Sequence, residues 1–408
     1  MSAEDDGHSP PRPVDTGARL GTALLLYMIG VMLIVTLLPF HFVWPEQWEV
    51  TVGGDAYDFA VSVVLFIPLG FLLRFATPRG RPESVAVSIW TATLISVMIE
   101  ALQLFDPTRV SAILDVVGNT LGAGIGALAF ERIARSAGLA GRAIGWLGLE
   151  MPLMALVYLL VPLRWANSLA ARGEWVPIGT TFLIGAFGAM LLGGLQRHYF
   201  GPSRAAEPHH TAAFAALWFV AGAFALLVWQ PLGLAAGTLG VAALCWWQGR
   251  RPLHDAGSNR RFEVPLLRSA LPLFAVYLVV LAIAPLFGVM GAWRGGIGFP
   301  AVAPSRVETA QVLELCAAFT LLGYIATELR GRDVKGYRDA FPRLIAWGVG
   351  LAIAVEAARG FDLHGASAAR GVLLVAAGLF GGWLYYLQRA HVIWLLSNNA
   401  SSVDRRNT

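Results

Sequence analysis

The stretch EALQLFDPTRVSAILDVVGNTLGAGIG, residues 100–126, decides the fold because it sets a polar turn between two apolar runs. Each run is close to the roughly 20 residues that a helix needs to cross a bilayer. Two such runs joined by a short polar turn predict an antiparallel pair of membrane helices. The polar residues that gather near this turn are Glu100, Gln103, Arg109, Asp115 and Asn119.

The composition extends this prediction to the whole chain. Of the 408 residues, 56% are hydrophobic and 14% are charged, which is too little polar surface to cover a soluble globule of this size. We therefore predict an all-α, polytopic transmembrane helical bundle of about 12 spans. Only Gln230 and Pro231 separate the seventh and eighth spans, which predicts a very tight turn. The predicted spans are 20–40, 58–77, 84–105, 111–131, 148–169, 175–195, 211–229, 231–248, 266–287, 307–328, 342–358 and 367–390.

The arginine distribution predicts how these spans are oriented. With the N-terminus in the cytoplasm, all but seven of the 30 lysine and arginine residues fall on the cytoplasmic side, as the positive-inside rule requires. Both termini are then cytoplasmic, and the 41–57 loop and the 106–110 turn lie on the outer side. The seven exceptions are Arg109, Arg164, Arg172, Arg294, Arg306, Arg359 and Arg370.

The end of the chain repeats the opening stretch. Shifting the sequence by 256 residues, from 100 to 356, aligns Glu100 with Glu356 and Gly122 with Gly378. Internal repeats are common in transporters, and we predict two parallel copies of a four-helix unit separated by four spans. The predicted divisions are a cytoplasmic tail (1–19), the first unit (20–133), a central region (134–265), the second unit (266–396) and a second cytoplasmic tail (397–408).

The second unit loses most of the polar residues of the first. At the same offset, Asp115 aligns with Gly371. Glu356 remains, and we predict that it forms a structural ion pair with Arg359 or Arg370.

A row of glycines recurs in both units. Gly118, Gly122 and Gly126 are spaced four residues apart, which lets another helix approach closely. The first unit is expected to use this row to pack against its second or third span. Gly378 and Gly382 are the predicted equivalents in the second unit.

Four polar side chains can face one another across the 100–126 helix pair, with Arg109 above them. Glu100 and Gln103 are three residues apart on one helix, and Asp115 and Asn119 are four apart on the next. Charges at membrane depth are costly unless paired, so the cluster is either a structural clamp or a binding site. Two carboxylates facing one arginine leave surplus negative charge. This favours a site with Arg109 as an anion contact and a carboxylate as a proton acceptor or ligand.

Asp58 begins the second span on the same side, and Ser62 follows one turn later. Asp58 is either a member of the site or simply the cap of its helix.

Cofactor, metal and nucleic-acid functions are not indicated. His209 and His210 are adjacent rather than four residues apart, so we predict no zinc site and no other metal. Cys245 and Cys316 lie in separate apolar runs and are expected to be inert packing residues. The net charge of +4 is not clustered on a soluble domain, so we expect no nucleic-acid partner, and no nucleotide fingerprint predicts a cofactor.

The first unit resembles the VanZ-like family of bacterial membrane proteins. The resemblance rests on Asp58, the FIPLGF motif at 66–71, Glu100-x-x-Gln103, Arg109, Ser111 and Asp115-x-x-x-Asn119-Thr-Leu-Gly122. Ser62 departs from the family, which usually has an asparagine there. The resemblance implies a multi-pass protein of the bacterial cytoplasmic (inner) membrane that is associated with the cell envelope and its polysaccharides.

Three functions fit this reading. The first is a non-enzymatic envelope protein that binds or moves an anionic amphiphile, such as a polyprenyl-phosphate or a lipid-linked glycan, at the outer leaflet. The second is a membrane-embedded transferase or hydrolase with Asp115 or Glu100 as general base. The third is a structural subunit of a polysaccharide or export complex. The expected partners are membrane lipids and envelope-assembly proteins.

Overall fold

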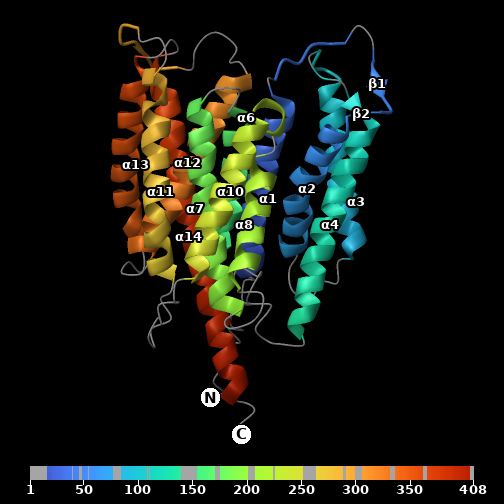
Figure 1. Cartoon of the computed structure of the whole chain (residues 1–408), viewed down its shortest axis with the longest axis vertical. Helices are drawn as coiled ribbons and strands as arrows, with labels where there is room; N and C mark the ends of the chain where they lie inside the picture. Colours follow the sequence, from blue (N-terminus) through green and yellow to red (C-terminus); the bar gives the residue numbers. More distant parts are fainter. Residues whose placement is uncertain are drawn as a thin grey trace, which may run out of the picture.

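The chain folds into a bundle of long helices joined at its two ends by loops (Figure 1). This computed structural model describes residues 16–38, 40–45, 48–53, 55–76, 84–107, 109, 111–138, 154–170, 175–200, 207–223, 226–250, 263–287, 291–298, 306–330, 336–361 and 365–404. The predicted all-α, polytopic fold is confirmed.

The first part of the chain supplies a group of helices and one pair of very short strands. These elements are α1 (Thr16–Leu37), β1 (Val50–Thr51), α2 (Ala56–Ala76), α3 (Val85–Gln103), β2 (Ser111–Ala112) and α4 (Ile113–Gly138). The middle of the chain supplies α6 (Met154–Ala170), α7 (Trp175–Phe200), α8 (Pro208–Gly222), α9 (Leu226–Trp229) and α10 (Pro231–Arg250).

The last part of the chain repeats the helix and strand order of the first. Its elements are α11 (Glu263–Ile283), the 3-10 turn η2 (Ala284–Phe287), β3 (Gly295–Gly296), α12 (Arg306–Arg330), α13 (Tyr337–Arg359), β4 (Ala366–Ser367) and α14 (Ala368–Asp404).

Nine described helices are long and apolar enough to cross a membrane, namely α1, α2, α3, α4, α7, α11, α12, α13 and α14. The other predicted spans coincide with α6, α8 and α10, and α6 is a shorter apolar helix. Membrane crossing by these three helices stays a prediction. The start of the predicted span 148–169 lies outside the described residues.

Two helices extend beyond the predicted spans, because hydropathy locates the apolar core of a span rather than the ends of its helix. α13 begins five residues before the predicted 342, and α14 continues past the predicted 390 to Asp404. The predicted span 211–229 is also interrupted. α8 ends at Gly222, and the short α9 follows before Gln230, so more than a two-residue turn connects α8 to α10.

Apolar side chains also cover the outward faces of α3 and α4. Trp90 and Leu94 of α3 are exposed, as are Leu121 and Leu128 of α4. A large apolar surface of this kind is stable only against lipid, because soluble proteins rarely expose contiguous apolar patches.

α2 and α4 are in backbone contact through glycines, as predicted for the glycine row. A Cβ built at Gly122 would overlap the carbonyl oxygen of Val63, and one at Gly126 would overlap that of Ile67. No other residue fits at these two positions without separating the helices.

In the corresponding contact between α12 and α14, Gly381 rather than Gly382 touches the backbone of α12. A Cβ at Gly381 would overlap the carbonyl oxygen of Thr320, whereas a Cβ at Gly382 would meet the side chains of Leu344 on α13 and Thr327 on α12. Gly378 does lie at the contact, beside Gly323.

Two parallel strand pairs fasten loops to the starts of α4 and α14. Val50 pairs with Ser111 in β1–β2, and Gly296 pairs with Ser367 in β3–β4. Figure 1 shows β1 and β2 at one end of the bundle and the end of α14 at the other. We refer to the former as the β1–β2 end.

The packing of the two predicted units differs at their first helix. α1 packs against α2, but α11 packs mainly against α7, and α6 covers α12. α1 also contacts α14 and α6, so it joins the α2–α4 group to the rest of the bundle (Figure 1). The second unit therefore stays a prediction.

Candidate functional site

Glu100 fastens the end of α3 to the start of α4. Its Oε2 accepts a hydrogen bond of 3.1 Å from the backbone N–H of Ala112, and the Ser111 hydroxyl donates to the Glu100 carbonyl oxygen at 2.8 Å. The side chain is buried at the β1–β2 end. A carboxylate in this position stabilises a strand amide that would otherwise be buried without an acceptor.

Arg109 links this pair of helices to α1. Its Nη2 donates to the carbonyl oxygen of Leu38 at 3.3 Å, and its guanidinium interacts electrostatically with Glu100 and Asp115. The turn that carries it is closed by the backbone N–H of Arg109, which donates to Asp106 at 3.0 Å. Arg109 thus interacts electrostatically with both carboxylates, as predicted from the sequence.

α2 supplies the next wall of the cluster. The Ser62 hydroxyl donates to Oδ1 of Asp115 at 3.3 Å, and Asp58 interacts electrostatically with Asp115. Asp115 is half-buried, whereas Asp58 is exposed. The cap of α2 is Asp55 rather than Asp58, because Oδ1 of Asp55 accepts from the backbone N–H of Tyr57 at 3.4 Å. The Asp58 carboxylate is therefore not the cap that the alternative interpretation assumed.

Gln103 and Asn119 point toward neighbouring helices. Nε2 of Gln103 donates to the carbonyl oxygen of Thr36 at 2.9 Å, which joins α3 to α1. Nδ2 of Asn119 donates to the Ser96 hydroxyl at 2.8 Å, which joins α4 to α3. Both amides are buried and hold the helices that carry the charges. The four polar side chains therefore do not all contact one another, because Gln103 binds α1 and Asn119 binds Ser96 instead.

Asp106 is a site residue that the sequence interpretation missed. It is buried beside Arg109 at the β1–β2 end, although its position before Pro107 suggested only a turn. Asp106 lies in the same turn as Arg109, whose guanidinium interacts electrostatically with Glu100 and Asp115, and Asp58 in turn interacts with Asp115. This cluster has surplus negative charge at neutral pH unless it holds protons.

The aligned glutamate of the second unit is fully paired. Nε of Arg370 lies 2.6 Å from Oε1 of Glu356, Nη2 lies 2.7 Å from Oε2, and Oε2 also accepts from the backbone N–H of Ser367 at 2.7 Å. The predicted structural ion pair is therefore confirmed, with Arg370 as the partner. A bidentate pair of this kind leaves little capacity for a ligand.

A second buried polar network lies where four helices meet. Oε1 of Glu314 on α12 accepts from Nδ2 of Asn167 and from the Tyr277 hydroxyl, each at 2.8 Å. Asn167 lies on α6 and Tyr277 on α11, and the Thr181 hydroxyl of α7 donates to Oδ1 of Asn167 at 2.7 Å. All these side chains are buried, and together they tie the central region to α11 and α12.

Arg164 is also buried and is bound by backbone carbonyls. It donates to Trp218 at 2.9 Å and to Phe219 at 2.8 Å, close to the C-terminus of α8. A cation favours the carbonyl end of a helix, so capping accounts for this arginine.

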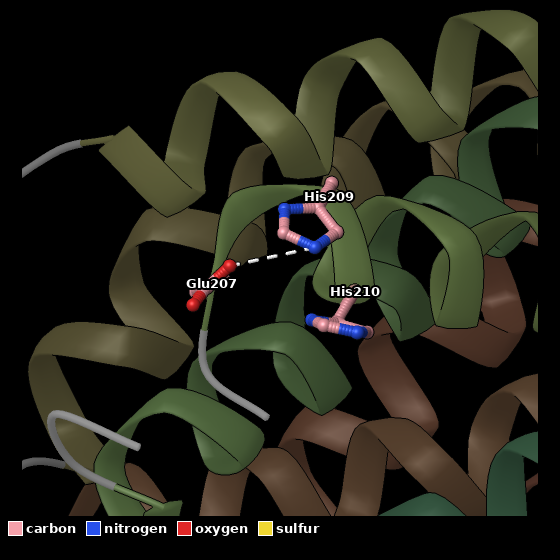
Figure 2. Close-up of side chains that lie close together, drawn as sticks. All are labelled: Glu207, His209 and His210. Atoms are coloured by element: carbon pink, nitrogen blue, oxygen red, sulfur yellow. Dashed lines mark ion pairs between the residues drawn. The ribbon is translucent and has the colours of Figure 1, made fainter. Parts of the chain in front are cut away.

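Three residues with metal-binding donors lie together at the start of α8 (Figure 2). Nε2 of His209 lies 3.4 Å from Oε2 of Glu207, and His210 stacks beside His209 with 4.1 Å between the ring centroids. One donor atom from each residue lies within 4.8 Å of the others. All three are neighbours in sequence and largely exposed, and the contact between His209 and Glu207 accounts for their arrangement.

A family model described as VanZ/LLP1 matches residues 20–135, and this range includes all six residues predicted for the site. The match does not extend to the predicted second unit. No curated protein and no solved structure matches the chain. The protein is therefore a helical membrane protein whose N-terminal part, residues 20–135, is a VanZ-like unit.

Proposed function

We propose that this protein binds or moves an envelope lipid with an anionic, sugar-bearing headgroup at the outer leaflet of the bacterial cytoplasmic membrane. The proposal rests on one observation, the cluster of carboxylates around Arg109 at the β1–β2 end. The aligned region of the predicted second unit has a closed ion pair instead.

The two kinds of charge in the cluster suit two parts of such a headgroup. A guanidinium is the side chain best suited to bind a phosphate, because its donors match the phosphate oxygens. Carboxylates accept hydrogen bonds and repel phosphate, but they bind the hydroxyl groups of sugars. In this proposal, the carboxylates of exposed Asp58 and half-buried Asp115 accept hydrogen bonds from such hydroxyls. This balance favours a lipid-linked glycan over a bare polyprenyl-phosphate.

The arginines support the proposed outer location of the cluster. Arg74, Arg250 and Arg330 lie in the last turns of α2, α10 and α12, at the end of the bundle opposite the cluster. The positive-inside rule then assigns that opposite end to the cytoplasm and the β1–β2 end to the outside.

The test is a binding measurement with the full-length protein in lipid nanodiscs, using a fluorescent lipid-linked glycan and the matching polyprenyl-phosphate as probes. Arg109→Ala is expected to weaken binding of both probes at least about 10-fold, because a charge-assisted phosphate contact contributes on this scale. Asp115→Asn is expected to weaken binding of the glycan probe only.

The matched control is Arg294→Ala, which removes an exposed arginine just before β3 and outside the cluster. Unchanged glycan affinity in Arg109→Ala, with normal thermal stability, would contradict the proposal. Chemical analysis of the recovered probe tests the alternative interpretations, since a transferase or hydrolase would return a modified product.

A further inference from the structure

The loop between α1 and α2 exposes large apolar side chains beside the candidate site. We call its described residues, 40–45 and 48–53, the aromatic loop. Trp44 is 78% exposed, Trp48 is 55% exposed and Val52 is 76% exposed. An aqueous loop with this composition is unfavourable, because apolar surface in water raises the free energy.

The aromatic side chains of this loop are ordered by packing on the site. The ring centroids of Trp44 and Trp48 are 6.0 Å apart, and they lie 5.7 Å and 5.6 Å from the ring of Phe105 in the 104–107 turn. The backbone N–H of Val43 donates to the Phe105 carbonyl at 2.8 Å. The exposed tryptophans are therefore held in one cluster on the turn that carries Asp106 and Arg109.

The position of this cluster identifies what covers it. α1 ends just before the aromatic loop and α2 begins just after it, and both are candidate membrane spans. Tryptophan prefers the boundary between lipid headgroups and acyl chains, where the ring is buried and the indole N–H stays hydrated. We propose that the aromatic loop inserts into this boundary and that the lipid surface is its partner.

The second half of the chain has a similar exposed loop. Trp293 is 56% exposed and Ile297 is 88% exposed, and both belong to the loop that contains β3. Nε1 of Trp293 donates to the carbonyl oxygen of Ala357 near the end of α13 at 3.2 Å. A loop with exposed tryptophan, attached to the end of a helix, thus occurs before both α2 and α12.

Insertion of the aromatic loop fixes the depth of the candidate site. β1 lies within the loop and pairs with β2, whose Ala112 amide binds Glu100. Arg109 binds the carbonyl of Leu38, where α1 leads into the loop. The carboxylates and Arg109 are therefore at the level of the lipid headgroups, and a ligand reaches them sideways from the bilayer. The sideways approach of the ligand rests on the proposed function, whereas the depth of the loop does not.

The test measures depth by electron paramagnetic resonance of spin labels on the full-length protein in nanodiscs. The background variant carries Cys245→Ala and Cys316→Ala, and one label is attached at Trp44→Cys or at Val52→Cys. Val52→Cys keeps both tryptophans, so it remains informative if Trp44→Cys disturbs the loop. The controls are His209→Cys in an exposed helix start and Leu94→Cys on the exposed face of α3.

For each label, the spin relaxation caused by oxygen is divided by that caused by a water-soluble nickel complex. We expect this oxygen-to-nickel ratio to be several-fold higher for the loop labels than for the His209→Cys label. The loop values are expected to fall between those of the two controls. Values equal to the His209→Cys value would place the loop in water and overturn the proposal. Dipolar broadening between copies in one nanodisc would show that a second copy covers the loop and would also overturn it.

Failure of this inference is distinguishable from failure of the proposed function. The depth measurement needs no ligand, and the binding measurement with Arg109→Ala needs no label. Insertion of the loop with no loss of binding in Arg109→Ala would contradict the proposed function alone.

Discussion

Glu100 illustrates at the scale of one residue how a charge can be both structural and available for function. Its Oε2 accepts from the Ala112 amide, while the charges of Arg109 and Asp115 also act on this carboxylate. The first contact depends on an acceptor oxygen, whereas the others depend on charge. The two roles can therefore be separated by substitution.

Glu100→Gln is expected to keep most of the stability, because its amide oxygen can still accept from Ala112. Glu100→Ala leaves that amide buried without an acceptor and is expected to cost about 1–3 kcal/mol. Thermal unfolding of the two variants in detergent tests this expectation. The unfolding midpoint should be lower for Glu100→Ala than for Glu100→Gln. Asp58→Asn, at an exposed position of the same cluster, is the control and should change little. Equal midpoints for the two Glu100 variants would contradict the structural role.

The charged members of the site could be predicted from the sequence, but the partners of the uncharged members could not. Glu100, Arg109 and Asp115 are conspicuous because charge is rare in apolar spans. Gln103 donates to a backbone carbonyl of α1, and every residue has such a carbonyl, so the sequence does not mark this partner. Asp106 was missed because an aspartate before proline is typical of an ordinary turn.

At the scale of the helix, the contact between α2 and α4 depends on glycine at particular positions. Gly122 and Gly126 touch the backbone of α2, whereas the nearest atom to a Cβ at Gly124 is a side-chain carbon of Ile89, 3.7 Å away. The same helix thus contains glycines that are required for packing and one that is not.

Gly122→Ala is expected to force α2 and α4 apart and to lower the unfolding midpoint strongly, since overpacking costs about 1–3 kcal/mol or more. Gly124→Ala is the matched control, and it should be neutral or stabilising by up to about 1 kcal/mol because alanine favours helix over glycine. Thermal unfolding of both variants in the same detergent tests this contrast. A midpoint for Gly122→Ala equal to that of Gly124→Ala would show that the contact tolerates a side chain.

The glycine row was predictable as a packing feature, but its orientation in the second unit was not. The repeat offset predicted that Gly382 would touch the backbone of α12, whereas Gly381 is the residue that does. One residue turns a helix by about 100°, so a small difference in helix rotation changes which glycine faces the partner. The spacing of glycines in the sequence predicts that they share one face of their helix, but it does not predict which neighbouring helix that face contacts.

At the scale of the whole molecule, the orientation in the membrane remains a prediction with a direct test. In a variant without Cys245 and Cys316, single cysteines are placed at Ala56, at the start of α2 and outside the aromatic loop, and at Ser84 before α3, which are exposed positions at opposite ends of α2. A membrane-impermeant maleimide should label Ala56→Cys in intact spheroplasts and Ser84→Cys only after the membrane is opened. The reverse pattern would place the candidate site in the cytoplasm and remove the proposed outer-leaflet function.

Hydropathy located the helices of this bundle but not which helices pack together. The repeat offset predicted that α11 would accompany α12 as α1 accompanies α2, yet α6 takes that position beside α12. The Glu314 network provides a physical reason, because its contacts join α6, α11 and α12 through one carboxylate oxygen. Such a network depends on residues far apart in the chain, which no local pattern reveals.

The last turn of α1 is completed by side chains from other parts of the chain. The carbonyls at the end of a helix lack partners within it and carry partial negative charge. The Gln103 side chain donates to the carbonyl oxygen of Thr36, and the Arg109 guanidinium donates to the carbonyl oxygen of Leu38 just beyond the helix. The guanidinium is thus shared between the dipole of α1 and the carboxylates. A ligand that drew Arg109 toward itself would leave the C-terminus of α1 uncapped, so binding and the fraying of that helix end are thermodynamically linked.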